Sequence, residues 1–85
     1  MKFILRKSLF KVLKNTPEVI EYLEQIEEDD DGVSFKIKKD DIQEVQLLIN
    51  DEIVLHGMND QERVNDLGLK LYKLYDELLY QKKKQ

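Results

Sequence analysis

Residues that could act as acids, bases or nucleophiles are few in this sequence of 85 residues. There is one histidine, His56, and no cysteine, and Ser8 and Ser34 lack the glycine-flanked turn of a nucleophile elbow. Histidine is the side chain that ordinarily changes charge near neutral pH, but His56 directly precedes Gly57, where we expect it to end a helix, cap carbonyls and lie at the edge of the core. The sequence therefore predicts no catalytic residue and a protein that is not an enzyme.

The acidic run Asp29-Asp30-Asp31-Gly32 is the closest approach to a metal-binding motif. A calcium-binding EF-hand loop needs oxygen ligands at alternate positions and a glycine at its sixth position. Here the aspartates are consecutive and the glycine comes too early. The three glycines are also isolated from one another, which excludes a glycine-rich phosphate loop. We predict no metal, no cofactor and no small-molecule ligand.

Charge alternates in blocks, although the formal net charge is only −4. Lys2–Lys14 and Lys36–Lys39 are basic, as is the end of the chain, whereas Glu18–Asp31 and most of Asp40–Asp66 are acidic. Opposite blocks can pair across a compact fold, at less than ~1 kcal/mol for each exposed pair. A nucleic-acid surface would need the basic blocks together, but arginine is scarce and no binding motif is present. We therefore rank nucleic-acid contact below protein contact.

No apolar run approaches the ~20 residues that a membrane-spanning helix needs, and MKFILRK is not a secretory leader. We expect one small cytoplasmic domain, residues 1–85, with a frayed basic tail at about 82–85. The composition lacks alanine and is rich in lysine, isoleucine and asparagine. This bias suggests an AT-rich genome, that of a bacterium or of a mobile element such as a phage or plasmid.

Apolar periodicity predicts a helix over Ser8–Asn15 and leaves Phe3–Arg6 open between strand and helix. A second helix is expected over Pro17–Glu28, with Thr16 as its N-cap and proline at the first helical position. Val33–Lys38 alternates between apolar and polar residues, which is typical of a half-buried strand that needs a pairing partner.

The stretch Asp40–Gly57 has the densest apolar content, and the fold depends on its structure. As a helix it would start with a capping box of Asp40 and Gln43, end at Gly57 and be largely enclosed. As a β-hairpin it would turn at Asn50-Asp51, which the many β-branched residues favour. We prefer the helix and keep the hairpin, spanning residues 43–56, as the alternative.

Met58–Asp66 is expected to be a polar loop, in which either Asn59/Asp60 or Asn65/Asp66 caps a last helix over roughly Val64–Lys82. This helix carries an apolar arc broader than one neighbouring helix covers. We call it the Leu/Tyr face and predict that it is a protein interface. Its residues are Leu71, Tyr72, Leu74, Tyr75, Leu78 and Leu79.

These expectations add up to a mainly helical α+β domain in the order helix, helix, strand, helix, helix. The alternative order is α-α-β-β-β-α, with the hairpin in place of the central helix. For function we expect a small non-enzymatic protein-binding module, with a protein partner or a second copy bound at the Leu/Tyr face. The alternatives are a nucleic-acid-associated accessory or regulatory protein, and an acidic inhibitor that mimics nucleic acid.

Overall fold

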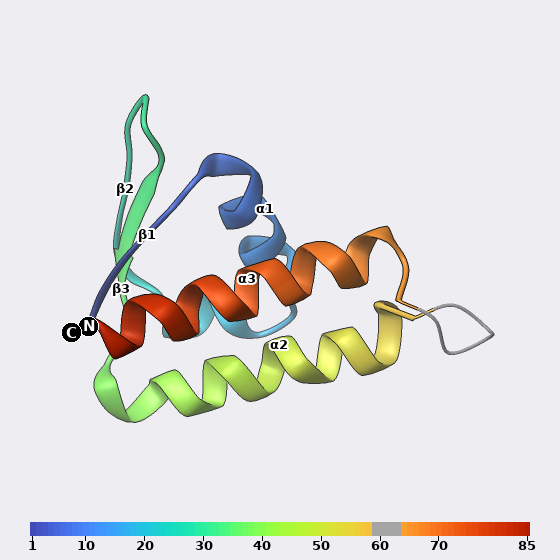
Figure 1. Ribbon diagram of the computed structural model, residues 1–85. Coiled ribbons are helices and arrows are strands. Elements are labelled where there is room, and N and C mark those ends of the chain that lie inside the picture. Colours follow the sequence, from blue (N-terminus) through green and yellow to red (C-terminus); the bar gives the residue numbers. More distant parts are fainter. Residues whose placement is uncertain (59–63) are drawn as a thin grey trace.

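The computed structural model describes residues 1–58 and 64–85 and has an α+β architecture that is mainly helical. A three-stranded antiparallel sheet lies at one end of a group of three helices, and its β2–β3 hairpin projects beyond them (Figure 1). The elements in chain order are β1 (Lys2–Leu5), α1 (Lys7–Asn15), the 3-10 turn η1 (Val19–Tyr22), β2 (Glu24–Glu28), β3 (Val33–Lys36), the 3-10 turn η2 (Lys39–Asp41), α2 (Ile42–His56) and α3 (Asp66–Lys83). The α+β class is thus confirmed, whereas the predicted order of elements is wrong at the two strands β1 and β2.

Strand β3 lies in the middle of the sheet, between β1 and β2. Its predicted alternation is confirmed over Val33–Lys36, where Val33 and Phe35 are buried and Lys36 is exposed. Strand β1 has the same period, with Phe3 facing the core and opposite Phe35 in the register. The rings of Phe3 and Phe35 stack with centroids 5.8 Å apart, so the sheet contributes two aromatic side chains to the core.

The expected helix over Pro17–Glu28 is wrong. Thr16 ends α1 instead, and its hydroxyl donates to the Val12 carbonyl at 2.9 Å. Glu18 has a left-handed backbone with φ 68°, which interrupts any helix at that point, and only the short η1 turn follows. The acidic residues after η1 then pair with β3 as β2. A run of carboxylates is unfavourable at the negative end of a helix, whereas a strand has little net dipole.

The hairpin turn depends on close packing at Gly32. Asp29 accepts hydrogen bonds from the Asp31 and Gly32 amides at 2.8 and 3.0 Å. A Cβ atom on Gly32 would lie 2.6 Å from the Leu5 carbonyl oxygen, too close for any side chain without a shift of backbone. The acidic run is therefore a structural turn, held against the end of β1.

The stretch Asp40–Gly57 forms the helix α2, and the hairpin alternative is wrong. The capping box is absent, since the N-cap is Asp41 and its side chain accepts no capping hydrogen bond. The expectation of a largely enclosed helix holds on one side only. Its inner side chains, such as Ile49, are buried, but Leu47 and Val54 are 48% and 60% exposed. Helix α2 thus has an apolar outer surface that the described residues leave open.

Helix α3 starts as one of the two predicted caps requires. The Asn65 side chain accepts a hydrogen bond from the Gly68 amide at 2.8 Å and donates to the His56 carbonyl at 3.0 Å. The competing caps, Asn59 and Asp60, lie outside the described residues. Gly57 and Gly68 touch where α2 and α3 come together. A Cβ atom on either glycine would be too close to the backbone of the other. Asn65 and the two glycines therefore hold the helices side by side (Figure 1).

One apolar core joins the sheet to all three helices. The sheet and each of the three helices contribute fully buried side chains, among them Leu5 of β1, Leu13 of α1, Ile53 of α2 and Leu74 of α3. In the described part of the chain, no helix has both the length and the apolar character to cross a bilayer. The helix α3 extends through Lys83, and the fraying of the basic tail stays a prediction.

Candidate functional site

A groove lies between α1 and α3, which are neighbouring helices in Figure 1. It consists of two hollows of about 510 and about 550 Å³. Both hollows are lined by Arg6, Leu9 and Lys73, so they form one continuous feature. We call it the α1/α3 groove. Its lining on α3 runs from Leu67 to Tyr80, which corresponds to about 20 Å along the helix axis.

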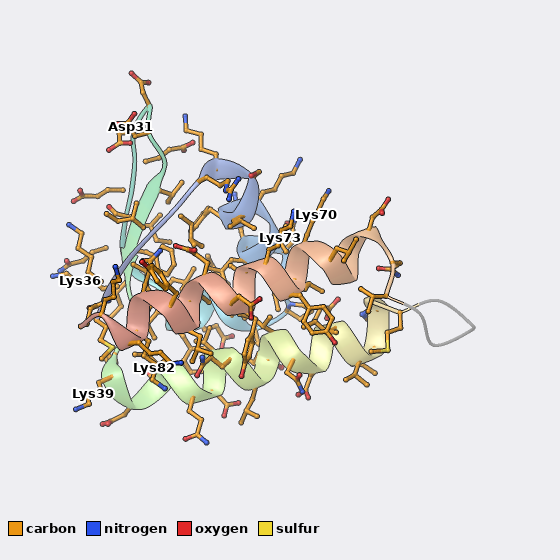
Figure 2. All side chains as sticks on the ribbon, viewed as in Figure 1. Asp31, Lys36, Lys39, Lys70, Lys73 and Lys82 are labelled. Atoms are coloured by element: carbon orange, nitrogen blue, oxygen red, sulfur yellow. The ribbon has the colours of Figure 1, made fainter. Side chains whose placement is uncertain are left out.

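Four cations line the first hollow: Arg6 and Lys11 on one side, Lys70 and Lys73 on the other. Figure 2 shows Lys70 and Lys73 on the part of α3 that is next to α1. Within the described residues, none of the four pairs with a carboxylate. Lys70 and Lys73 are three positions apart, so they lie on adjacent turns of one helix face. The four charges therefore act together on whatever enters the groove.

Apolar side chains form the floor between these cations. Leu9 and Leu71 are buried, Val12 is half-buried, and Leu67 is 40% exposed at the mouth. Such a surface offers contact area to an apolar side chain and charge to its acidic neighbours. It is amphipathic in the same sense as a groove that binds an amphipathic helix.

Three acidic residues also line the groove. Glu52 lines the first hollow, and its carboxylate is 2.8 Å from Nδ1 of His56. Asp76 and Glu77 line the second hollow, beside Tyr80. The groove is therefore basic at the end near Lys70 and mixed at the end near Tyr80, which gives it a direction.

The single histidine is not a core residue. Its side chain is 62% exposed and contacts Glu52 one turn earlier on α2, so the expectation that it edges the core is wrong. Ser8 lines the groove, but it is exposed. The described residues include no cluster of three acidic or histidine side chains that could hold a metal ion.

The Leu/Tyr face divides between core and surface. Leu71, Leu74 and Leu78 are at most 2% exposed and pack inside the domain, so a folded copy does not present them to a partner. Tyr75 and Leu79 are half-buried, and Tyr72 is 41% exposed. A protein interface at the outer members of this face stays a prediction.

A group of carboxylates lies around Tyr22. Partial burial raises the pKa of Tyr22, and the nearby carboxylates of Glu44 and Asp41 raise it further. Glu21 and Glu18 act in the same direction, so two acidic segments of the sequence meet around one phenol. Asp31 lies at the tip of the β2–β3 hairpin in Figure 2.

The groove could not be found from the sequence. The basic block Lys36–Lys39 of the sequence does not join the groove. Figure 2 shows Lys36 and Lys39 at the far end of the molecule from Lys70 and Lys73, and Lys36 lies opposite Lys2 in the sheet. In the sequence, Lys70 and Lys73 are recognisable only as part of the polar side of the expected last helix. Their meeting with Arg6 and Lys11 depends on the contact of the first and last helices.

No protein-family model, curated protein or solved structure matches the chain. Its function is therefore inferred from its own groove, charges and strand edges.

Proposed function

We propose that this chain is a non-enzymatic protein-binding module whose α1/α3 groove holds an acidic, amphipathic segment of a partner protein. The observation that carries this proposal is the set of four cations around an apolar floor. Unlike Lys7 and Lys38, which pair with Glu28 and Glu24, these four have no carboxylate partner among the described residues. Carboxylates on a partner would supply the missing opposite charge.

The dimensions of the groove support a helical occupant. About 20 Å along α3 accommodates three to four turns of a helix. A helix with leucine at every third or fourth position would place these side chains on Leu9, Val12 and Leu67. Its carboxylates would flank the same face and meet Arg6, Lys11, Lys70 and Lys73. Asp76 and Glu77 would repel acids at the other end, which fixes the direction of binding.

The test is a calorimetric titration of the protein with an acidic amphipathic peptide. A peptide of equal composition, with its leucines distributed around the helix, serves as the control ligand. We expect the first peptide to bind at least about tenfold more tightly, because only it presents one apolar stripe. Equal binding of both peptides would show that the groove acts as a charged surface alone.

Two matched variants locate the binding site. Lys70→Glu with Lys73→Glu reverses two groove charges, and Lys36→Glu with Lys39→Glu makes the same change of net charge far from the groove. We expect about tenfold or greater loss of affinity from the first pair and less than about twofold from the second. Similar losses from both pairs would place binding outside the groove.

Single-stranded nucleic acid provides the competing outcome. Its phosphates could also meet four cations, and such binding would weaken steeply as the salt concentration rises. An oligonucleotide that binds at moderate salt and displaces the acidic peptide would contradict the proposal and support the nucleic-acid-associated alternative.

The carboxylates around Tyr22 support a second candidate function. We propose as this alternative an inhibitor that mimics nucleic acid, because Glu18 and Glu21 meet Asp41 and Glu44 around Tyr22. In this case the protein would bind a nucleic-acid enzyme through these carboxylates, and added DNA would displace it. Glu18→Gln with Glu44→Gln would then weaken binding, whereas Lys70→Glu would have little effect.

A further inference from the structure

Strand β1 forms one edge of the sheet, and alternate residues of this strand turn their backbone groups outward. Phe3 pairs with Phe35 and Leu5 with Val33 in the register, and the Ile37 amide donates to the Met1 carbonyl at 2.9 Å. The N–H and C=O groups of Lys2 and Ile4 point the other way, toward the open edge. Four backbone groups therefore have no partner within the sheet.

Two glutamines near the end of α3 satisfy these four groups. The Gln81 amide accepts from the Ile4 N–H at 2.9 Å and donates to the Ile4 carbonyl at 2.7 Å. Gln85 makes the same two bonds with Lys2, at 3.1 and 2.6 Å. A primary amide has one acceptor and one donor side by side, as a strand residue does. The two glutamines are four positions apart, so they lie on one face of α3 and pair with the strand edge one after the other.

We propose that the β1 edge is a pairing surface for the β1 strand of a second copy, and that Gln81 and Gln85 mask it within the monomer. An exposed strand edge readily pairs with another chain, and proteins protect such edges by covering them. Here the cover is made of four exposed hydrogen bonds from flexible side chains. This inference is independent of the α1/α3 groove.

A second β1 strand fits this edge because the pattern of its outward groups is self-complementary. In an antiparallel pair about a two-fold axis at Phe3, Lys2 faces the partner's Ile4 and Ile4 faces the partner's Lys2. Each of these pairs exchanges two backbone hydrogen bonds. Every group released by Gln81 and Gln85 therefore regains a partner, and the two sheets become one sheet of six strands.

Opening the edge requires movement of the end of α3 only. Leu78 is buried and anchors the helix, but the residues beyond it are less firmly packed: Leu79 is half-buried and Tyr80 is 54% exposed. Unwinding after Leu78 would carry both glutamines away from β1. The core packing of Leu71, Leu74 and Leu78 would remain.

The first test removes the cover. Gln81→Ala with Gln85→Ala leaves all four outward groups of β1 uncapped, and we expect dimerisation to strengthen at least about tenfold by sedimentation equilibrium. Hydrogen exchange identifies the site, since the Ile4 amide should become protected again as the variant dimerises. A folded double variant that stays as monomeric as the wild-type protein would overturn the proposal.

The second test uses charge at position 4, where the side chain is 58% exposed on the outer face of the sheet. In the double variant, Ile4→Lys places a cation opposite the partner's Lys2, whereas Ile4→Glu places an anion there. We expect the first change to restore the monomer and the second to keep the dimer. Equal effects of both substitutions would mean that the dimer uses another surface.

The same pair of substitutions decides the case if the double variant does not fold. Gln85→Ala alone frees only the two Lys2 groups and leaves the Gln81 contact with Ile4 in place. A weaker dimer with the same preference for Ile4→Glu over Ile4→Lys is then expected. Absence of that preference in the folded single variant would overturn the proposal.

Discussion

The two edges of the sheet are protected in different ways. At β1, the strand is regular, and the side-chain amides of Gln81 and Gln85 pair with its backbone. At β2, the strand carries a bulge between Glu24 and Glu27, and every residue is exposed. The β1 edge is covered and can be uncovered, whereas the β2 edge is irregular and negatively charged, so it disfavours pairing permanently.

The difference follows from what lies beside each strand. Helix α3 passes next to β1 and can reach its backbone with side chains, but the β2–β3 hairpin projects away from the helices (Figure 1). Besides its pairing with β3, strand β2 is contacted by two exposed ion pairs, Lys7 with Glu28 and Lys38 with Glu24. Each of the following changes tests one part of this comparison.

The largest effect is expected at Gly32, where the hairpin turn meets β1. Gly32→Ala would place a Cβ atom against the Leu5 carbonyl oxygen and push the hairpin turn away from the end of β1. We expect the free energy of unfolding, measured with urea, to fall by about 3 kcal/mol. Asp30→Ala, at the exposed tip of the same turn, is the control and should change it by less than about 0.5 kcal/mol. Equal effects would mean that the close packing at Gly32 is unimportant.

The next effect concerns the cover on β1. Gln81→Ala removes two hydrogen bonds to Ile4, and we expect a loss of about 1 kcal/mol in the free energy of unfolding, since these bonds are exposed. Gln81→Glu should lose part of this, because a carboxylate accepts from the Ile4 N–H but cannot donate to its carbonyl. Faster exchange of the Ile4 amide in Gln81→Ala is the direct measurement, and Gln81→Glu should change this exchange less because it keeps the acceptor. Unchanged exchange would show that the contact is not formed in solution.

The bulge of β2 predicts an unusual response at Gln25, whose φ of 50° is left-handed. Valine favours strands in general, but a β-branched residue is poorly tolerated at positive φ. We expect Gln25→Val to destabilise the protein by about 0.5–1 kcal/mol and Gln25→Asn to be neutral or slightly stabilising. Thermal unfolding of the two variants compares them, and a stabilising valine would argue for a regular strand.

The smallest effect is expected for the charges of the β2 edge. Lys7 and Glu28 are 3.7 Å apart, with both side chains more than half exposed. Glu28→Gln should therefore change the free energy of unfolding by less than about 0.5 kcal/mol, and the change should vanish at high salt. A larger effect that persists in salt would mean that this ion pair, and not the bulge, maintains the hairpin.

Much of the helical structure could be predicted from sequence because its signals are local. The apolar period and the break at Thr16-Pro17 placed α1, the period and Gly57 placed α2, and Asn65 was one of two caps expected for α3. Strand β3 was recognised by its alternation. The error at β2 arose because Val19, Ile20 and Leu23 have helical spacing, while the pairing that makes residues 24–28 a strand comes from β3.

Local sequence signals could not predict the candidate site, the α1/α3 groove. Arg6 and Lys73 are far apart in the sequence, and nothing in either neighbourhood indicates the other. The same is true of Ile4 and Gln81, which are 77 positions apart. The breadth of the Leu/Tyr face could be seen in the sequence, but the domain itself buries three of its leucines, Leu71, Leu74 and Leu78.

The sequence by itself determined the three helices, the central strand and the α+β class, since the hydrogen bonds of a helix close within four residues and its caps are local. Only the tertiary structure decided the strands β1 and β2, the α1/α3 groove and the cover on the sheet edge. A strand obtains its hydrogen-bond partners from distant segments, and a groove exists only between elements that have packed. The surfaces on which the proposed functions rest therefore belong to the fold and not to any one segment.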